Sequence, residues 1–399
     1  MKIDWLRPLL GEPGPFATVY LDATPSREST DREIGSRWRS VRRSLESQGA
    51  PPGLCDTLEE ALRSSARGVG VHGRVLVATE EAGILVDRVL SEPPAVQHGE
   101  YGPVPYLIQA ARAADETVDH LVVTVDRQGA DLTWSVGGER ANQPEPLTVE
   151  GGHDDITKVK TGSLNDRRLD ARAEDSWERN AEAVAAEVDR QVAEHRPELV
   201  VLTGEGRSVG LVRGALSKRS VDLLVEVPGG SRSAGAKDSV FAQRLADEVE
   251  ACRARRRAVV VDAYREGQGR ADGSVTALAD VVTVLQRGQV RELILSDELR
   301  SGSEIDGTEV WVGPEPLQIG SDRASVVALG ADDGVHPLPA SVALVRAALG
   351  QDAGLTFVPA GSVELVDGVG ALLRWTDAGT PSESAPTMSG DQRRLRDVV

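Results

Sequence analysis

A short basic stretch holds the residues of this chain that are best suited to binding an anion. Its members are Lys158, Lys160, Arg167, Arg168 and Arg172, with Gly162, Ser163 and Asn165 among them. An arginine guanidinium is a planar fork that fits two phosphate oxygens at once, and a glycine lets a partner approach the backbone closely. From the residues alone, the stretch is either a contact for RNA phosphate or a surface loop ahead of a helix.

A second set of arginines is expected on one helix near the N-terminus. Residues 31–50 place Ile34, Trp38, Val41 and Leu45 at helical spacing. This spacing predicts a helix with one buried face. Its other face carries Arg37, Arg39, Arg42 and Arg43. Charge runs on a helix are usually a solvated face, and the alternative is a helix that contacts RNA.

Composition limits the kinds of partner. The chain has 399 residues and a formal net charge of −18, which argues against a protein that covers nucleic acid with its whole surface. We expect no DNA partner. Two distant cysteines and six scattered histidines give no disulfide framework and no metal-ligand spacing, so we expect no metal and no cofactor. The sequence shows no signal peptide and no apolar run of about 18 residues, so we expect a cytoplasmic protein with no membrane partner.

No arrangement of residues predicts a catalytic centre. The segment 230–239 resembles a phosphate-binding loop, but no glycine directly precedes Lys237, and Asp238 stands where a magnesium-binding hydroxyl is required. The GxSxG pattern of a nucleophile elbow is absent from the sequence. Asp126 and Asp131 flank a predicted hairpin turn, which explains them better than a metal site does. We therefore assign no catalytic residue.

Strands and helices alternate along the chain, which predicts an α/β fold. In the second unit, which begins near Glu116, this alternation favours a mostly parallel sheet covered by helices. We predict an N-terminal mixed α/β domain at residues 1–115, a middle domain at 116–262 and a C-terminal domain at 263–376. Residues 139–169 lack hydrophobic periodicity and predict a long loop in the middle domain. The composition of residues 377–399 predicts a disordered tail.

Several single elements are also predicted. Alternating apolar residues and turn signals predict hairpin-like strand pairs at 73–90 and 120–138. The apolar run at 324–331 predicts a strand. The helix after the long loop is expected to bury one face, with Trp177 as its anchor. That face consists of Ala173, Trp177, Ala181, Val184, Val188 and Val192.

Five segments, taken in order, resemble the archaeo-eukaryotic release-factor and Pelota superfamily. They are GPFATVYLD at 14–22, RVLVATEE at 74–81, VDRQGADL at 125–132, RRLDARAEDSWERNAEAVA at 167–185 and DGVGALLRW at 367–375. The resemblance is to the bacterial branch, which includes actinobacterial proteins and the ribosome hibernation factor Balon. It implies a ribonuclease-H-like middle domain and an L7Ae/L30e-like C-terminal domain.

The resemblance also implies a protein that binds the ribosome. In this superfamily the N-terminal domain reaches toward the decoding centre, and the middle loop enters the peptidyl-transferase centre. The C-terminal domain contacts a translational GTPase. The implied partners are therefore 23S and 16S rRNA, with elongation factor Tu as a further one. The candidates for contacts to the small subunit, chosen by charge alone, are Arg37, Arg39, Arg42 and Arg43.

The tripeptide that release factors use in catalysis is missing. Release factors carry Gly-Gly-Gln in the middle loop, where the glutamine helps to position a water on the peptidyl-tRNA ester. The corresponding residues, Thr161 to Arg168, read TGSLNDRR, with one glycine and no glutamine. We therefore expect a hibernation factor of the A site that is not an enzyme. Two alternatives remain: a peptidyl-tRNA hydrolase or ribosome-rescue release factor with an altered loop, and an interaction scaffold without a ribosome role.

In this reading the basic stretch lies against ribosomal RNA. The residues assigned to RNA binding are Lys158, Lys160, Gly162, Ser163, Asn165, Arg167, Arg168 and Arg172.

Overall fold

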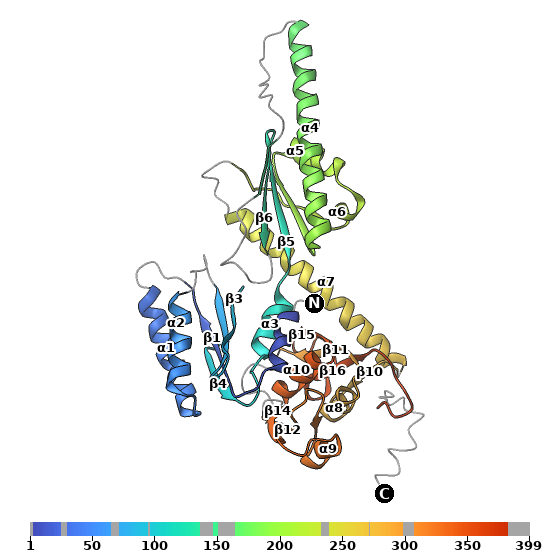
Figure 1. The fold of residues 1–399 in the computed structure, drawn as a ribbon. Coiled ribbons are helices and arrows are strands. Elements are labelled where there is room, and N and C mark those ends of the chain that lie inside the picture. The colour runs from blue at the N-terminus through green and yellow to red at the C-terminus, as the bar shows by residue number, and fades with distance from the viewer. Residues whose placement is uncertain are drawn as a thin grey trace. The chain divides into compact units, whose positions relative to one another are not determined.

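The chain folds as alternating helices and strands whose mutual contacts define two units. In the computed structural model, the described residues are 3–24, 30–64, 72–94, 96–135, 147–150, 164–232, 239–270, 272–297 and 307–381. Unit 1 comprises Met1–Glu116 with Arg255–Val399, and unit 2 comprises Thr117–Ala254. The predicted α/β class is confirmed (Figure 1). The domain boundaries and the likenesses to ribonuclease H and L7Ae stay predictions. In the described ranges, no helix has the length and apolar character needed to cross a membrane.

The N-terminal part of unit 1 is an antiparallel sheet in the order β3-β2-β1-β4. Its elements are the 3-10 helix η1 (Asp4–Gly11), β1 (Phe16–Asp22), α1 (Thr30–Ser47), α2 (Pro52–Ser64), β2 (Gly73–Thr79), β3 (Gly83–Leu90), β4 (His98–Gly102) and α3 (Ile108–Glu116). Alternate residues of a strand point to opposite faces. Ala17 and Val19 therefore pack with α1 and α2, while Phe16 and Tyr20 enter a separate core cluster.

The C-terminal part of unit 1 contains two further sheets, in the orders β10-β16-β11-β15 and β13-β12-β14. Its strands are β10 (Ser274–Thr276), β11 (Val290–Ser296), β12 (Glu309–Val312), β13 (Ile319–Gly320), β14 (His336–Pro339), β15 (Gly354–Val358) and β16 (Val369–Leu373). Its helices are α8 (Leu278–Gln286), α9 (Arg323–Ala328), α10 (Ala340–Gly350) and the 3-10 helix η3 (Val366–Gly368). Helix α10 is buried from Ala340 to Leu349, because it lies inside the cluster that also takes Phe16 and Tyr20.

The strand predicted at 324–331 is wrong, because α9 occupies most of that run. The side chain of Asp322 accepts a hydrogen bond from the Ser325 backbone N–H at 2.7 Å, and the Ser325 hydroxyl and Asp322 backbone complete a capping box. A capping box satisfies two otherwise unpaired donors at the start of a helix. The pattern of a short apolar run is equally compatible with a strand and a helix. In this run, the capping box stabilises the helix.

Unit 2 is a five-stranded sheet in the order β7-β6-β5-β8-β9. The strands are β5 (His120–Val125), β6 (Gly129–Ser135), β7 (Leu147–Glu150), β8 (Leu199–Gly204) and β9 (Leu224–Glu226). The helices are α4 (Leu164–His195), α5 (Gly206–Ala215), α6 (Lys218–Asp222) and the part of α7 (Ser239–Arg270) up to Ala254, after which α7 belongs to unit 1. Strands β5, β8 and β9 are parallel, but the β5-β6-β7 part is antiparallel. The mostly parallel sheet predicted for this unit is therefore wrong, because a hairpin and an added strand extend it on one side. Helices α4 and α5 pack on one face, and the first half of α7 packs on the other.

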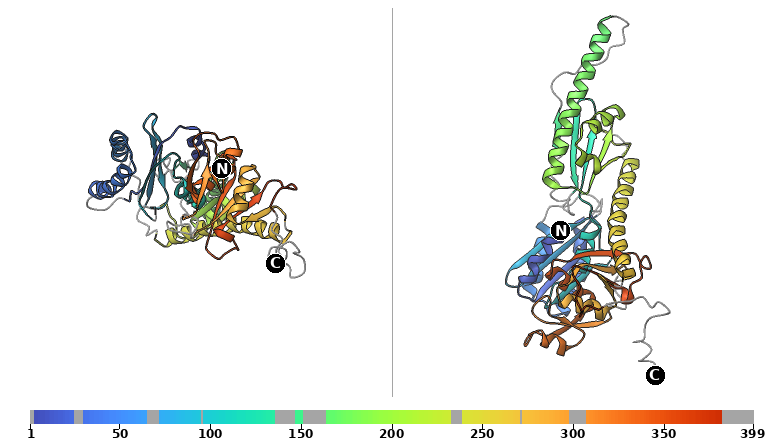
Figure 2. Two further views of the ribbon diagram at one scale, coloured as in Figure 1. Left: turned by 90° about the horizontal axis from the view of Figure 1, so that it is seen from below. Right: turned by 90° about the vertical axis from the view of Figure 1, so that its right-hand side faces the viewer.

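Helix α4 is held to the sheet by its C-terminal half. Ala181, Val184, Val188 and Val192 are buried in the cluster that contains Trp134 of β6. The Trp134 indole N–H also donates to Gln191 Oε1 at 2.9 Å, in a buried hydrogen bond. The N-terminal turns of α4 continue past the end of the β5–β6 hairpin (Figure 2). The apolar face was therefore predicted correctly from residue 181 onward.

Two predictions about this region need correction. Trp177 is only partly buried and is not a member of the core cluster, so it does not anchor the helix as predicted. The long loop predicted at 139–169 is interrupted by β7 and ends where α4 begins at Leu164. Strand β7 was missed because it is only four residues long, so its alternation of apolar and polar residues is too short to stand out from the predicted loop around it.

Candidate functional site

The basic stretch predicted to bind RNA lies largely outside the described residues. Lys158, Lys160, Gly162 and Ser163 fall outside them altogether. Helix α4 includes the backbone of Asn165, Arg167, Arg168 and Arg172. Their side chains are outside the described part. Spacings of three and four residues put the Cα positions of 165, 168 and 172 on one side of a helix. The assignment of the stretch to RNA stays a prediction.

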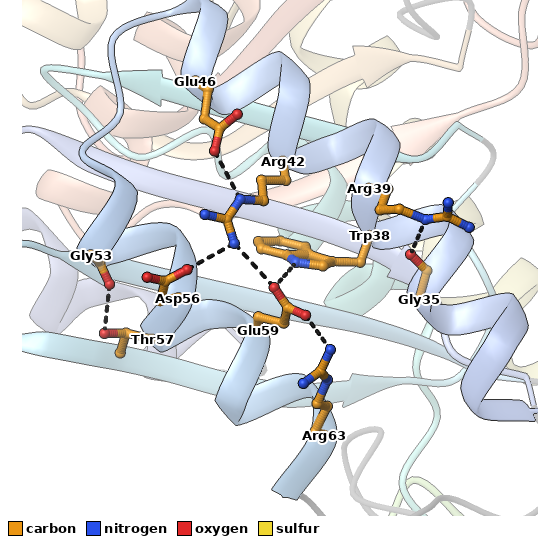
Figure 3. Close-up of polar contacts among 10 residues, drawn as sticks. All are labelled: Gly35, Trp38, Arg39, Arg42, Glu46, Gly53, Asp56, Thr57, Glu59 and Arg63. Carbon is orange, nitrogen blue, oxygen red and sulfur yellow. Dashed lines mark hydrogen bonds and ion pairs between the residues drawn. The ribbon is translucent and has the colours of Figure 1, made fainter.

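The arginines predicted on the N-terminal helix are divided by the structure into two kinds, and Arg42 belongs to the first. Its guanidinium donates to Glu46 at 2.8 Å, to Asp56 of α2 at 2.8 Å and to Glu59 of α2 at 3.1 Å (Figure 3). Hydrogen bonds to Glu46 and Asp56 raise the pKa of Arg42 above its usual value. Its charge is therefore engaged in joining α1 to α2.

Arg37 is also engaged, whereas Arg39 and Arg43 face solvent. Arg37 donates to the Asp22 carbonyl at 2.8 Å and lies 3.1 Å from the Asp22 carboxylate. The Nε atoms of Arg39 and Arg43 donate to backbone carbonyls of their own helix, those of Gly35 and Arg39, at 3.2 Å each. Both side chains are exposed. Arg39 and Arg43 are therefore the members of this set whose side chains are open to solvent.

Replacing Arg42 with alanine is expected to lower the stability of unit 1 by roughly 1–2 kcal/mol, because it removes three charge-assisted contacts and leaves neighbouring carboxylates together. Arg39→Ala and Arg43→Ala are expected to change stability by less than about 0.5 kcal/mol, since each removes an exposed side chain. Chemical denaturation of the three variants measures the difference. Equal stability of all three would contradict the division of this helix into engaged and presented arginines.

The two aspartates at the β5–β6 turn are bridged by an arginine. Arg232 lies 2.7 Å from Asp126 Oδ1 and 3.1 Å from Asp131 Oδ2. Burial by itself would raise the pKa of Asp131, but hydrogen bonds from Arg232 and Thr148 lower it below its usual value. A guanidinium thus occupies the place that a metal ion would need. Across the described residues, no three His, Cys, Asp or Glu side chains form a group able to hold a metal.

A cluster of one tryptophan and two arginines lies next to this turn, and it was not predicted from the sequence. The guanidinium carbons of Arg127 and Arg207 lie 5.0 Å and 4.7 Å from the centre of the Trp177 ring. Arg127 follows β5, and Arg207 is in the first turn of α5 after β8. The order of the strands is the signal that could have revealed this cluster, because loops that follow parallel strands gather at one edge of a sheet.

Unit 1 contains a cavity of about 590 Å³ beside β4, α3 and the start of α10. Apolar residues such as Val96, Ile108 and Val342 form much of its wall. Its charged lining residues are Glu92, Glu100, Glu116 and Arg112, and Arg112 is paired with Asp297 at 2.6 Å. Carboxylates therefore outnumber guanidinium groups, which makes this cavity unsuitable for phosphate.

The middle of the chain matches the model of a known protein family. Residues 119–270 match the model of Bacterial archaeo-eukaryotic release factor family 2. This release-factor-like segment contains all the strands of unit 2, the basic stretch and helices α4 to α7. The part of the predicted resemblance that concerns release factors is therefore supported for this segment.

Two relatives match nearly the whole chain. They are Uncharacterized protein Rv2629 of Mycobacterium tuberculosis (strain ATCC 25618 / H37Rv) and Uncharacterized protein MT2704 of Mycobacterium tuberculosis (strain CDC 1551 / Oshkosh). Each is 29% identical over 398 residues, covering 94% of this chain and 97% of the relative.

Solved structures of translation factors also align with most of the chain, at low TM-scores. S. cerevisiae Dom34, a translation termination-like factor, has a TM-score of 0.40 at 8% identity, covering 96% of this chain and 95% of its own. Archaeoglobus fulgidus Pelota has a TM-score of 0.36 at 12% identity, covering 94% and 92%. The archaeal translation termination factor aRF1 has a TM-score of 0.24 at 14% identity, covering 94% and 97%. These scores are too low to establish a shared overall fold.

Proposed function

We propose that this protein is a cytoplasmic hibernation factor that occupies the ribosomal A site without hydrolysing peptidyl-tRNA. The observation that supports the proposal is the match of residues 119–270 to a release-factor family. The residues at Thr161 to Arg168 contain no glutamine, so the side-chain amide that would orient a hydrolytic water is missing there. Asn165 is the one amide in that segment, and its side chain is shorter. A release-factor-like segment without this group fits binding better than catalysis.

The proposal assigns a partner to each part of the chain. Lys160, Arg167 and Arg168 would contact 23S rRNA at the peptidyl-transferase centre. On the N-terminal helix, Arg39 and Arg43 are the preferred contacts to 16S rRNA, because Arg37 and Arg42 are engaged with carboxylates. Elongation factor Tu is the proposed partner of the C-terminal segment, and the setting is a stress response. The negative net charge suppresses binding to other RNA, so affinity depends on sites where shape also matches.

Sedimentation with ribosomes from stationary cells tests this function. The wild-type protein is expected in the pellet with 70S particles at low salt. Arg167→Ala/Arg168→Ala is expected to weaken binding by at least about tenfold and to lower the log–log salt slope by about 2, since each lost phosphate contact lowers it by about 1. Arg167→Lys/Arg168→Lys is the matched control, because it keeps the charge and removes the bidentate fork.

Three outcomes of this experiment separate the alternatives. Wild-type protein that stays in the supernatant at low salt would refute the ribosome function and favour a scaffold. Release of peptide from peptidyl-tRNA, lost in Asn165→Ala or Arg167→Ala, would refute the non-catalytic proposal and favour a hydrolase. Binding without peptide release supports the proposal.

A further inference from the structure

The cluster of Trp177, Arg127 and Arg207 brings together side chains from three elements of unit 2. Trp177 is on α4, Arg127 is in the turn between β5 and β6, and Arg207 is on α5. The two guanidinium groups share one indole ring, at 5.0 Å and 4.7 Å from its centre. Both arginine side chains are exposed. Cation–π contact holds a guanidinium plane in one orientation, so two donor groups are fixed at one surface.

The backbone that carries these side chains is also fixed. Asp126 Oδ1 accepts hydrogen bonds from the N–H groups of Gln128 at 2.8 Å and Gly129 at 3.0 Å. Asn180 of α4 donates to the Arg127 carbonyl at 2.9 Å. The Glu205 N–H donates to the Val125 carbonyl at 3.0 Å, which ties the start of α5 to the end of β5. The arginines are therefore held in place before any partner arrives, which lowers the entropy cost of binding.

The carboxylate of Glu205 is paired with Arg127, one of the two arginines of this cluster. Arg127 donates to Glu205 Oε1 from Nε at 2.7 Å and from Nη2 at 2.5 Å, and this hydrogen bonding raises the pKa of Arg127. The side chains of Arg127 and Glu205 are 56% and 35% exposed. An ion pair so open to water contributes little to stability. An incoming anion can therefore replace Glu205 at small cost.

The first turn of α5 adds to the attraction for an anion. Glu205 is the N-cap residue of this helix, and its side chain makes no capping hydrogen bond. The amides at a helix start carry a partial positive charge and point toward an approaching anion. Arg207 is the second residue of the helix, so its guanidinium and these amides lie at the same end of α5.

We propose that Trp177, Arg127 and Arg207 form a second RNA contact in the release-factor-like segment, one that binds a backbone phosphate of ribosomal RNA. The inference rests on the proposed function for the identity of the RNA. Guanidinium forks match phosphate oxygens bidentately. Stacking of bases on aromatic rings and guanidinium planes is common in binding of unpaired RNA. The combination of two arginines and an indole therefore fits RNA better than an acidic peptide.

Binding of a fluorescein-labelled 12-nucleotide polyuridylate to the full-length protein tests the contact directly. Arg127→Ala/Arg207→Ala is expected to lower the affinity by at least about tenfold and the log–log salt slope by 1 to 2. Arg127→Lys/Arg207→Lys is expected to recover only part of the affinity, because lysine lacks the planar fork. Glu205→Gln is expected to raise the affinity, since it removes a carboxylate that competes with phosphate for Arg127. Unchanged affinity in the double alanine variant would overturn the proposal.

Two further measurements identify the partner and separate this inference from the proposed function. Oligoglutamate that displaced polyuridylate at equal concentration would overturn the assignment to RNA. On 70S particles, Arg127→Ala/Arg207→Ala is expected to sediment less than wild type. If the wild type and this variant sediment equally, the inference fails and the ribosome function stands. If the wild type does not sediment but its arginines bind polyuridylate, the ribosome function fails and the RNA contact stands. Unchanged thermal melting of the variant shows that it remains folded.

Discussion

Replacing Trp134 with alanine is expected to destabilise unit 2 by about 3–5 kcal/mol, the usual cost of removing a large aromatic side chain from a core. Trp134 is 7% exposed and lies between β6 and the C-terminal half of α4. Its ring also packs edge-on against His195 at 4.9 Å. Alanine would leave a cavity under α4 and would remove the indole N–H that bonds to Gln191. Chemical denaturation of the full-length protein, followed by circular dichroism, measures the loss.

The control for this experiment is the other tryptophan of the same region. Trp177→Ala removes a partly exposed ring that contacts two guanidinium groups, and it is expected to cost about 1 kcal/mol or less. Trp134→Phe is expected to fall between the two, because it keeps an aromatic ring but leaves the buried side-chain oxygen Oε1 of Gln191 without its donor. A larger loss for Trp177→Ala than for Trp134→Ala would contradict the packing of α4 described above.

The elements that the sequence predicted correctly are those whose signal is local. Strands β2 and β3 show apolar residues on either side of the turn at residues 80–82, and β5 and β6 flank the turn at Arg127–Gly129. The apolar face of α4 from Ala181 to Val192 follows from helical spacing alone. Strand β7 shows such a pattern over only four residues, and its place in the sheet depends on backbone pairing with β6. Its hydrogen bonds cannot be inferred from the residues that make them.

At the candidate sites, the sequence alone also does not show which charged residues are paired with a residue of opposite charge. The sequence presents Arg37, Arg39, Arg42 and Arg43 as one basic run, and helical spacing does not separate them by function. They are separated by carboxylates that lie elsewhere in the chain, such as Asp56 on α2. Arg232 likewise reaches Asp126 from 106 residues away. Which cation is neutralised and which is presented is a tertiary property, so it required the structure.

Gly204 is the position in unit 2 where alanine is expected to do the most damage to the backbone. Its φ angle is +128°, a conformation that is essentially restricted to glycine. A Cβ atom there would lie 1.9 Å from the carbonyl oxygen of Val125, so β5 and β8 would have to separate at this point. The same carbonyl accepts the hydrogen bond from the Glu205 N–H. We expect Gly204→Ala to cost roughly 3–5 kcal/mol, combining backbone strain of about 1–3 kcal/mol with the loss of this pairing.

Gly210, six positions further along, is expected to respond in the opposite direction. It lies inside α5, and nothing comes within 4 Å of a Cβ atom built there. Alanine in a helix interior is favoured over glycine by roughly 0.5–1 kcal/mol, so Gly210→Ala is expected to stabilise unit 2. Denaturant unfolding of both variants compares how the same substitution changes stability in two different backbone conformations. If Gly204→Ala unfolds within about 0.5 kcal/mol of the wild type, β5 and β8 do not meet as closely as described.

Gly204 also sets the position of the proposed RNA contact, because α5 and Arg207 follow it directly. A separation of β5 from β8 would move Arg207 away from Arg127, which stands at the end of β5. Gly204→Ala is therefore expected to weaken polyuridylate binding even at temperatures where the variant remains folded. Gly210→Ala leaves the start of α5 unchanged and is expected to bind as the wild type does. Loss of affinity in both variants would show that the stability of α5, and not the spacing of the two arginines, controls the contact.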